Sequence, residues 1–216
     1  MKLKPTIRIG KRKIGQGNPC FIIAEAGINH NNDLDIAKEM IRAAKKAGVD
    51  AIKFQTFRAS RLYTIKARGY KYIKEKESIY DVVKRYEIPF WWIPILKEYA
   101  ERKGLIFFST VSDELTANKI DKYVPCYKVA SYSITHIPLL KHLARKGKPM
   151  IISTGCANLA DIDIAVRTVE SLGNEQLAIM HCVGQYPAKL SSVNLAVIPS
   201  LKSCFGIPVG FSDHTV

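Results

Sequence analysis

The sequence predicts an α/β protein built on a (β/α)8 barrel, of which seven strands are present, with a β-hairpin in front of it. Seven short apolar runs each end in a polar or charged residue, and a helical stretch follows every run except the last. Buried parallel strands are continuously apolar because helices cover both faces of their sheet. Catalytic groups of such barrels sit at the carboxyl ends of the strands. The same pattern therefore predicts both the fold and the place of the site.

The first elements follow from alternation and helical spacing. Residues 6–15 alternate in polarity and contain a glycine, which predicts a β-hairpin that caps one end of the barrel. The first strand lies in FIIAEAGINH, where Glu25, Asn29 and His30 come at its end. Residues 33–47 have apolar positions at helical spacing, and Gly48 stands where a helix-terminating glycine belongs.

The remaining elements alternate regularly apart from one interruption. Residues 58–92 are rich in Lys, Tyr and Arg, and a long insertion of this kind after a strand is usually functional or a packed excursion. Proline and glycine signals bound most of the helices that follow. The expected strands lie in AIKFQT (51–56), IFFST (106–110), CYKVAS (126–131), MIISTG (150–155), LAIMHCVGQYP (177–187) and VGFSDHT (209–215); the expected helices are 93–103, 113–121, 138–146, 158–172 and, more weakly, 194–203.

Length and composition indicate one domain, an incomplete barrel over residues 1–216, in a cytoplasmic protein. Hydrophobic residues make up 47% of the chain, which argues against disorder. No apolar run reaches the roughly 18 residues of a membrane span, and the N-terminus lacks the apolar region of a secretory signal. The five cysteines are widely spaced with no CxxC pair, so we expect reduced, mostly buried thiols.

The net charge of +14 makes nucleic-acid binding the first alternative to consider. The basic residues, however, are scattered over predicted helix faces and loops, as in KARGYKYIKEKE and LKHLARKGK. No RNP, zinc-finger or helix-turn-helix signature accompanies them. A lysine-rich surface that attracts a small anionic substrate explains the excess, and we expect neither a nucleic-acid nor a membrane partner.

Two lysines and several hydroxyls follow the apolar strands and should meet at one barrel mouth. Ammonium and hydroxyl groups together with loop N–H groups make a suitable pocket for a phosphate. A Schiff-base aldolase that uses one of the lysines is an alternative of different chemistry. The residues of this expected anion pocket are Lys53, Thr110, Lys128, Ser131 and Ser153.

Glu25 and the histidines allow more than one interpretation. Glu25 is flanked by apolar residues and, since burial of an isolated charge is costly, it should be paired. It could act as a general acid or base, or form a structural ion pair with Lys53. His214 could bind a divalent metal through a neutral imidazole, although one ligand does not make a site. His30 is expected to orient the site and His181 to be a packed, hydrogen-bonded residue.

An ordered set of motifs resembles the sialic acid synthase family, which condenses phosphoenolpyruvate with N-acetylmannosamine-type sugars. AEAGINHNNDLDIAKEMIRAAKKAGVDAIKFQTF resembles the family's opening segment. The later matches are FFST, YKVAS, IPLLKHLARKGKPMIISTG, HCVGQYPA, VNLAVIPSLK and VGFSDHT. The resemblance covers residues 6–216, and the order of these motifs is far more specific than any one of them.

The resemblance implies a (β/α)8 barrel, a homodimer and a role for each polar strand-end residue. It implies that His214 is one ligand of a catalytic Mn²⁺ or Mg²⁺ and that Glu25 lies at the reacting centre. In the family's reaction the metal activates the open-chain sugar aldehyde, which C3 of phosphoenolpyruvate attacks, and phosphate leaves after water adds at C2. The implied phosphoenolpyruvate contacts are Lys53, Thr110, Lys128, Ser131 and Ser153, and the implied sugar contacts are Gln55 and Tyr186.

The sequence also departs from the family pattern. Ser133 stands where the family usually has a sugar-binding glutamate, and Gly184 stands where a polar residue often follows the HC motif. The family's second metal histidine, in an ERHFT-like segment of strand eight, and its C-terminal antifreeze-like domain are absent from these 216 residues. The alternative to a synthase is therefore a catalytically impaired barrel fragment that binds anions and sugars.

Overall fold

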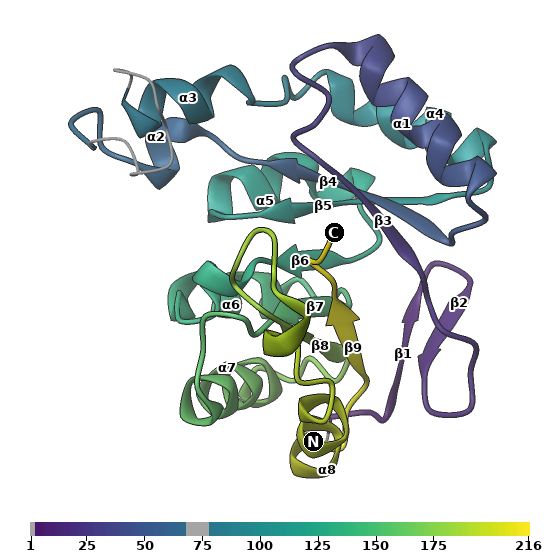
Figure 1. Ribbon diagram of the computed structural model, residues 1–216, viewed down its shortest axis with the longest axis vertical. Coiled ribbons are helices and arrows are strands. Elements are labelled where there is room, and N and C mark those ends of the chain that lie inside the picture. Colours follow the sequence, from purple (N-terminus) through teal and green to yellow (C-terminus); the bar gives the residue numbers. More distant parts are fainter. Residues whose placement is uncertain (1–2, 68–77) are drawn as a thin grey trace. The chain divides into compact units, whose positions relative to one another are not determined.

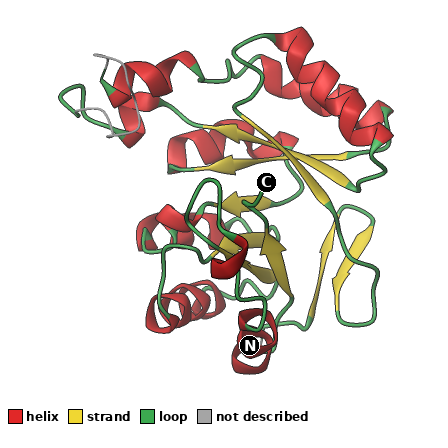
Figure 2. Ribbon diagram, viewed as in Figure 1, coloured by secondary structure: helices red, strands yellow, loops and turns green. Residues whose placement is uncertain are grey.

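The computed structural model describes residues 3–67 and 78–216, and the chain divides into two compact units. One is continuous, from Ile22 to Val124, and is called the 22–124 unit below. The other joins Met1–Phe21 to Pro125–Val216 and is called the two-segment unit. Each unit contains parallel strands that alternate with helices (Figures 1 and 2), so the predicted α/β class is confirmed.

The 22–124 unit is built on three parallel strands in the order β3 (Ile23–Gly27), β4 (Ala51–Thr56) and β5 (Ile106–Val111). Helices α1 (Leu34–Lys46) and α4 (Trp92–Arg102) lie side by side against these strands, and α5 (Glu114–Ile120) contacts β5 (Figure 1). Asp33 begins α1 by accepting hydrogen bonds from the backbone N–H groups of Asp35 and Ile36. The 3₁₀ turn η1 (Asp121–Tyr123) ends the unit.

The expected insertion at residues 58–92 is confirmed as a packed excursion in its described part. It contains α2 (Ala59–Leu62) and α3 (Ile79–Arg85), while residues 68–77 lie outside the described residues. The guanidinium of Arg58 lies 3.7 Å from the ring centre of Phe90 and donates to the carbonyls of Phe57 (2.7 Å) and Ile88 (3.0 Å). These contacts join the two ends of the excursion and hold it on the unit.

The two-segment unit has four parallel strands in the order β6 (Tyr127–Val129), β7 (Met150–Ser153), β8 (Leu177–Cys182) and β9 (Val209–Ser212). All seven strands that the apolar runs predict are therefore present. The long helices begin and end within about a residue of their expected bounds, and the last one begins later than expected, at Val197. The connecting elements are η2 (Ser131–Ser133), α6 (Ile137–Arg145), α7 (Leu159–Ser171), η3 (Leu190–Ser192) and α8 (Val197–Phe205).

The N-terminal hairpin of β1 (Thr6–Ile9) and β2 (Arg12–Gly15) is confirmed, and it caps the amino ends of two strands. The N–H of Lys4 donates to the carbonyl of Glu175, and Lys4 Nζ lies 2.5 Å from the Glu175 carboxylate. Both contacts come just before β8 begins. A Cβ on Gly15 would lie 3.1 Å from Pro208, which precedes β9. The hairpin thus leaves the carboxyl ends of the strands, where the expected site residues lie, uncovered.

The expectation that the cysteines are mostly buried is wrong. All five are free thiols, but only Cys126 and Cys182 are buried, while Cys20, Cys156 and Cys204 are exposed. The exposed ones sit in loops and at the end of α8, where apolar neighbours in the sequence do not imply an inward-facing side chain. Among the described residues, no helix combines the length and the apolar character that crossing a membrane requires.

His30 is a core residue of the 22–124 unit. It is fully buried, and its ring contacts the rings of Phe54 and Trp92 at centroid distances of 6.3 and 5.6 Å. Its Nδ1 accepts a hydrogen bond from the N–H of Asn32 at 3.0 Å, which holds the turn before α1. His30 lies in the turn directly after β3, as expected of a loop or strand-end residue, but its buried side chain packs in the core, which replaces the expected role of orienting the site.

We predict that His30 makes the protein less stable in mild acid. Burial lowers the pKa of His30, so the folded chain takes up this proton less readily than the unfolded chain, whose histidines titrate near about 6.5. The free energy of unfolding is unaffected well above that pH and falls as the pH drops below it, by up to about 1.4 kcal/mol per pH unit. Urea unfolding at several pH values would measure this slope.

The matched variant is His30→Phe, which keeps an aromatic ring between Phe54 and Trp92 but cannot take up a proton. Its free energy of unfolding should depend less on pH below about 6.5 than that of the wild type. Parallel pH profiles for the two proteins would contradict the assignment.

Candidate functional site

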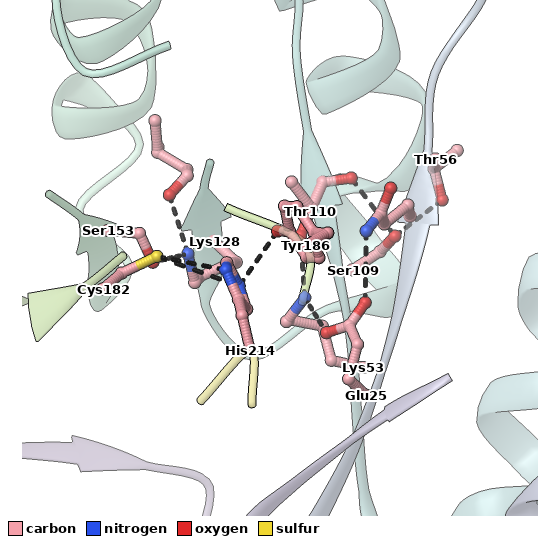
Figure 3. A network of polar contacts seen from close by, with 12 residues as sticks. Glu25, Lys53, Thr56, Ser109, Thr110, Lys128, Ser153, Cys182, Tyr186 and His214 are labelled. Atoms are coloured by element: carbon pink, nitrogen blue, oxygen red, sulfur yellow. Dashed lines mark hydrogen bonds and ion pairs between the residues drawn. The ribbon is translucent and has the colours of Figure 1, made fainter. Parts of the chain in front are cut away.

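Four predicted site residues meet on one face of the 22–124 unit (Figure 3). Lys53 Nζ forms an ion pair with the Glu25 carboxylate and donates to Thr110 Oγ1 at 3.1 Å. Gln55 Nε2 donates to Glu25 Oε1 at 3.2 Å. The result is a connected group of one cation, one carboxylate, one amide and one hydroxyl.

Strand register explains why these four side chains meet. Glu25 pairs with Lys53 across β3 and β4, and Gln55 pairs with Thr110 across β4 and β5. Because side chains alternate along a strand, Lys53 and Gln55 share a face, and their register partners share it too. The regular pairing of β3 shifts between Glu25 and Gly27, where Gly27 has a positive φ of 55°.

Glu25 differs from its expected surroundings. Its side chain is 45% exposed, whereas that of Lys53 is nearly buried at 11%. The apolar residues beside it in the sequence lie on the strand but do not enclose the carboxylate. The ion pair with Lys53, one of the two interpretations of Glu25, is present; a role as general acid or base stays a prediction.

A second group lies in the two-segment unit and contains the other lysine (Figure 3). Lys128 is buried, and its Nζ donates to Ser153 Oγ at 2.5 Å and to the carbonyl of Val129 at 2.9 Å. Lys128 lies opposite Ile151 in the register of β6 and β7, and Ser153 is two residues further along the same face. Lys128 and Ser153, two residues of the expected anion pocket, are therefore in contact within one unit.

The backbone of the turn after β7 packs closely against this second group of residues. Ser131 Oγ accepts a hydrogen bond from the N–H of Gly155 at 3.1 Å and lies 3.5 Å from Cys182 Sγ. A Cβ on Gly155 would lie only 2.9 Å from both the carbonyl oxygen and Sγ of Cys182. Only glycine lets this turn pack on β8, and the turn then presents its N–H beside Ser131.

His214 is held by two hydrogen bonds that define its tautomer. Its Nδ1 lies 2.7 Å from the carbonyl oxygen of Val183, and because a carbonyl only accepts, Nδ1 carries the proton. Nε2 is then an acceptor, and the Tyr186 hydroxyl lies 2.9 Å from it. The two rings stack with centroids 4.0 Å apart, and Cys182 Sγ lies 3.8 Å from both ring nitrogens.

The remaining polar residues near these strand ends differ in burial and in their hydrogen-bond partners. His181 is buried with Nε2 2.6 Å from the carbonyl of Val193, as expected of a packed histidine. The backbone N–H of Thr215 is the main cause that holds the pKa of the exposed Asp213 carboxyl below its ordinary value. Ser133, which takes the place of the family's glutamate, is buried. The hydroxyls of Thr56 and Ser109 form a hydrogen bond of 2.8 Å on the opposite face of β4 and β5.

The arrangement suits anion binding better than metal binding by side chains alone. In the 22–124 unit Lys53 contacts Thr110. In the two-segment unit Lys128 contacts Ser153, and the N–H of Gly155 contacts Ser131. Ammonium, hydroxyl and N–H groups are the donors from which phosphate and carboxylate groups accept. Among the described residues, no three histidine, cysteine, aspartate or glutamate side chains cluster as a metal site. His214 offers one nitrogen, with its other nitrogen bonded to a carbonyl as in metal-ligating histidines.

Sequence reasoning missed Gly155 and Cys182 as parts of the second group. Gly155 stands in the STG motif beside a serine and a threonine, and unlike them it has no side-chain functional group. Cys182 lies two residues beyond Met180 on the face that β7 and β8 share with Ser153. Counting the alternation along β8 would have placed its thiol there.

Comparison with known proteins identifies the family. The model of the NeuB family matches residues 40–216. The chain is 47% identical over 211 residues to the spore coat polysaccharide biosynthesis protein SpsE of Bacillus subtilis, a match that covers 96% of this chain and 57% of SpsE. The crystal structure of SpsE matches with a TM-score of 0.85 at 44% identity over 97% of this chain and 57% of that one.

Two further relatives carry the names of synthases. The chain is 40% identical over 216 residues to the N,N'-diacetyllegionaminic acid synthase of Legionella pneumophila, with 96% of this chain and 61% of that protein covered. A crystal structure of the N-acetylneuraminic acid synthetase of Leptospira borgpetersenii, in complex with citrate, matches with a TM-score of 0.88 at 35% identity. That match covers 99% of this chain and 72% of the synthetase chain.

This chain belongs to the NeuB family, which confirms the resemblance seen in its motifs. It spans about three fifths of the length of the curated relatives named above.

We predict that Gly155→Ala destabilises the protein although it adds only a methyl group. The new Cβ would overlap backbone and side-chain atoms of Cys182, and such overpacking costs about 1–3 kcal/mol of unfolding free energy. The matched control is Gly210→Ala in β9, where a Cβ would make an ordinary 3.5 Å contact with Met180 and should not destabilise. Equal denaturation midpoints for the two variants would show that the turn after β7 accommodates a methyl group, which would contradict the prediction.

Proposed function

We propose that this protein catalyses, as part or whole of an enzyme, the condensation of phosphoenolpyruvate with an N-acetylated hexose to form a nonulosonic acid of the sialic type. The observation that carries the proposal is the pair of lysine and hydroxyl groups at strand ends in a member of the NeuB family. The names of two relatives, a legionaminic acid synthase and a sialic acid synthetase, support this class of product. The alternative of an impaired binding fragment is not favoured by these relatives.

We assign phosphoenolpyruvate to the lysine, hydroxyl and backbone N–H groups, which donate hydrogen bonds. Its phosphate and carboxylate both accept hydrogen bonds, and Lys128, Ser153, Ser131 and the N–H of Gly155 can supply them. Lys53 and Thr110 offer a second cation and hydroxyl. The citrate bound to the Leptospira relative supports an affinity for carboxylates in this family.

The sugar is assigned to groups that can both donate and accept. Gln55 and Tyr186 can bind sugar hydroxyls or the N-acetyl group, and Glu25 is the carboxylate nearest to Lys53. We propose that Glu25 acts at the reacting centre, where its ion pair with Lys53 keeps it oriented.

His214 is proposed to hold a divalent Mn²⁺ or Mg²⁺ through Nε2. The support is an imidazole whose Nδ1–H is fixed on the Val183 carbonyl, as in metal-ligating histidines, and whose Nε2 has the lone pair that now accepts from the Tyr186 hydroxyl. When bound, the metal supplies Lewis-acid polarisation of the sugar aldehyde. The residues of this chain bind and orient the two substrates: C3 of phosphoenolpyruvate forms a bond to the aldehyde carbon, water adds at C2, and inorganic phosphate leaves.

We also propose that the strand–helix units belong to a (β/α)8 barrel and that the protein works as a homodimer. The barrel is supported by the parallel strands that alternate with helices in both units and by the assigned residues, which lie on these strands or beyond their carboxyl ends. The homodimer is carried over from the family resemblance and would be tested by light scattering.

We predict that the 216-residue chain has synthase activity when it is continued with the C-terminal remainder of a relative. The assay measures phosphate release from phosphoenolpyruvate with Mn²⁺ and N-acetylmannosamine, its 6-phosphate or its dideoxy diacetamido analogue. Two proteins should be compared: the 216-residue chain, and the same chain continued with the C-terminal remainder of the Legionella synthase. The Legionella enzyme itself is the positive control. No turnover of any sugar by either protein, while the control is active, would reject the proposal.

We predict that Lys128→Ala weakens phosphoenolpyruvate binding by about 10- to 150-fold, which corresponds to the 1.5–3 kcal/mol of a hydrogen bond to a charged group. Lys53→Ala should act in the same direction. Isothermal titration calorimetry measures both, with Lys141→Ala on the exposed face of α6 as the control. Unchanged affinity in both variants would place the anion pocket elsewhere.

A further inference from the structure

Gly27, the last residue of β3, lies directly against the side chains of Glu25 and Gln55. A Cβ added to this glycine would lie 3.1 Å from Glu25 Oε1, 3.8 Å from Glu25 Cγ and 3.6 Å from Gln55 Nε2. Gly27 itself is buried. The carboxylate and the amide therefore rest on a stretch of backbone that has no side chain of its own.

An irregularity in β3 brings Gly27 to this place. Glu25 lies opposite Lys53 in the register, but Gly27 lies opposite Phe54, so the residue between them, Ala26, is extra on its strand. Such a bulge bends a strand and turns its side chains in new directions, and bulges are common next to active sites. The φ of Gly27 is 55°, a left-handed conformation that glycine adopts without steric cost.

A side chain at position 27 would move the carboxylate rather than the backbone. The 3.1 Å contact with Glu25 Oε1 is tighter than ordinary van der Waals contact, so one of the two atoms has to give way. Glu25 is 45% exposed, which leaves its carboxylate free to swing towards solvent. Oε1 is also the atom that accepts from Gln55 Nε2 at 3.2 Å, so this hydrogen bond would be lost first.

We propose that Gly27 is a positioning residue for Glu25. Because position 27 has no side chain, the carboxylate lies down on the strand, where Oε2 pairs with Lys53 and Oε1 holds the Gln55 amide (Figure 3). With its nitrogen directed at Glu25, Gln55 presents its carbonyl oxygen, which accepts from a hydroxyl or from the N–H of an acetamido group. The inference rests on the proposed function, in which Glu25 acts at the reacting centre and Gln55 binds the sugar.

The test compares Gly27→Ala with Gly48→Ala. Gly48 belongs to the same unit and has a φ of 75°, but a Cβ there would meet nothing within 4 Å, so Gly48→Ala reproduces the backbone strain alone. NMR of the 216-residue chain follows the side-chain amide of Gln55, assigned by the loss of its signals in Gln55→Ala. Gly27→Ala should move these signals towards those of an unbonded amide, and Gly48→Ala should leave them unchanged.

A double-mutant cycle shows whether Gly27 acts through Glu25. Glu25→Ala should move the Gln55 amide signals by itself, and adding Gly27→Ala to it should cause no further change, because residues that act through one contact are not additive. Gly27→Asn carries the same Cβ on a residue that adopts a positive φ more readily. It is the second variant should Gly27→Ala not fold.

The synthase assay measures the effect on the reaction, with the chain continued by the Legionella remainder. Gly27→Ala should lower kcat/KM for the sugar by about 10- to 150-fold, the cost of one hydrogen bond to a charged group, while Gly48→Ala stays near the wild-type value. In the Glu25→Ala background, Gly27→Ala should lower it no further.

The outcomes separate this inference from the proposed function. Gln55 amide signals that stay at their wild-type position in both Gly27 variants, or that still move when Gly27→Ala is added to Glu25→Ala, would overturn the positioning role. An active protein whose kcat/KM is unchanged by Gly27→Ala would overturn it too. No turnover by the wild-type protein, while the Legionella enzyme is active, would reject the proposed function, and the NMR result would still decide whether Gly27 positions Glu25.

Discussion

The pairing register of the parallel strands is the constraint on which both groups of polar residues depend. A shift of one residue in β4 would turn Lys53 and Gln55 to the other face and replace them with Phe54 and Thr56. The same holds for Lys128 and Ser153 in β6 and β7. Apolar residues such as Phe54 and Ile152, which are completely buried, fix the register because their exposure would be costly. The burial of the apolar side chains therefore fixes the positions of the polar side chains on the other face of each strand.

The polar groups themselves are stable only because they satisfy one another. A lysine ammonium taken out of water loses several kcal/mol of hydration unless other groups replace it. Lys53 recovers this through Glu25 and Thr110, and Lys128 through Ser153 and the carbonyl of Val129. These contacts hold the cations in place before any substrate arrives, which lowers the entropy lost when an anion binds. The hydrogen bonds that stabilise the site are thus also those that substrate must rearrange.

Local pattern predicts the strands and helices well because each apolar run and each helix cap acts within a few residues. The hairpin, the seven strands and the end of α1 at Gly48 all follow from such signals. Burial is harder to predict, because it depends on which face a side chain takes. Glu25 sits among apolar residues and yet reaches solvent, whereas His30 lies in a turn among asparagines and yet enters the core. Gly155 could not be recognised from its neighbours, since its role is to make room for Cys182, 27 positions further along the chain.

The division of the chain into one continuous and one two-segment unit has a consequence for biosynthesis. Residues 22–124 are made without interruption and can complete their internal contacts while the ribosome is still at work. The hairpin is made before residues 22–124, but its partners Glu175, Gln176 and Pro208 are made after them. Closing a segment of that length carries an entropic cost that grows with chain length, and such distant contacts form slowly. The hairpin strands therefore meet their partners only after the strands and helices of the 22–124 unit have been made.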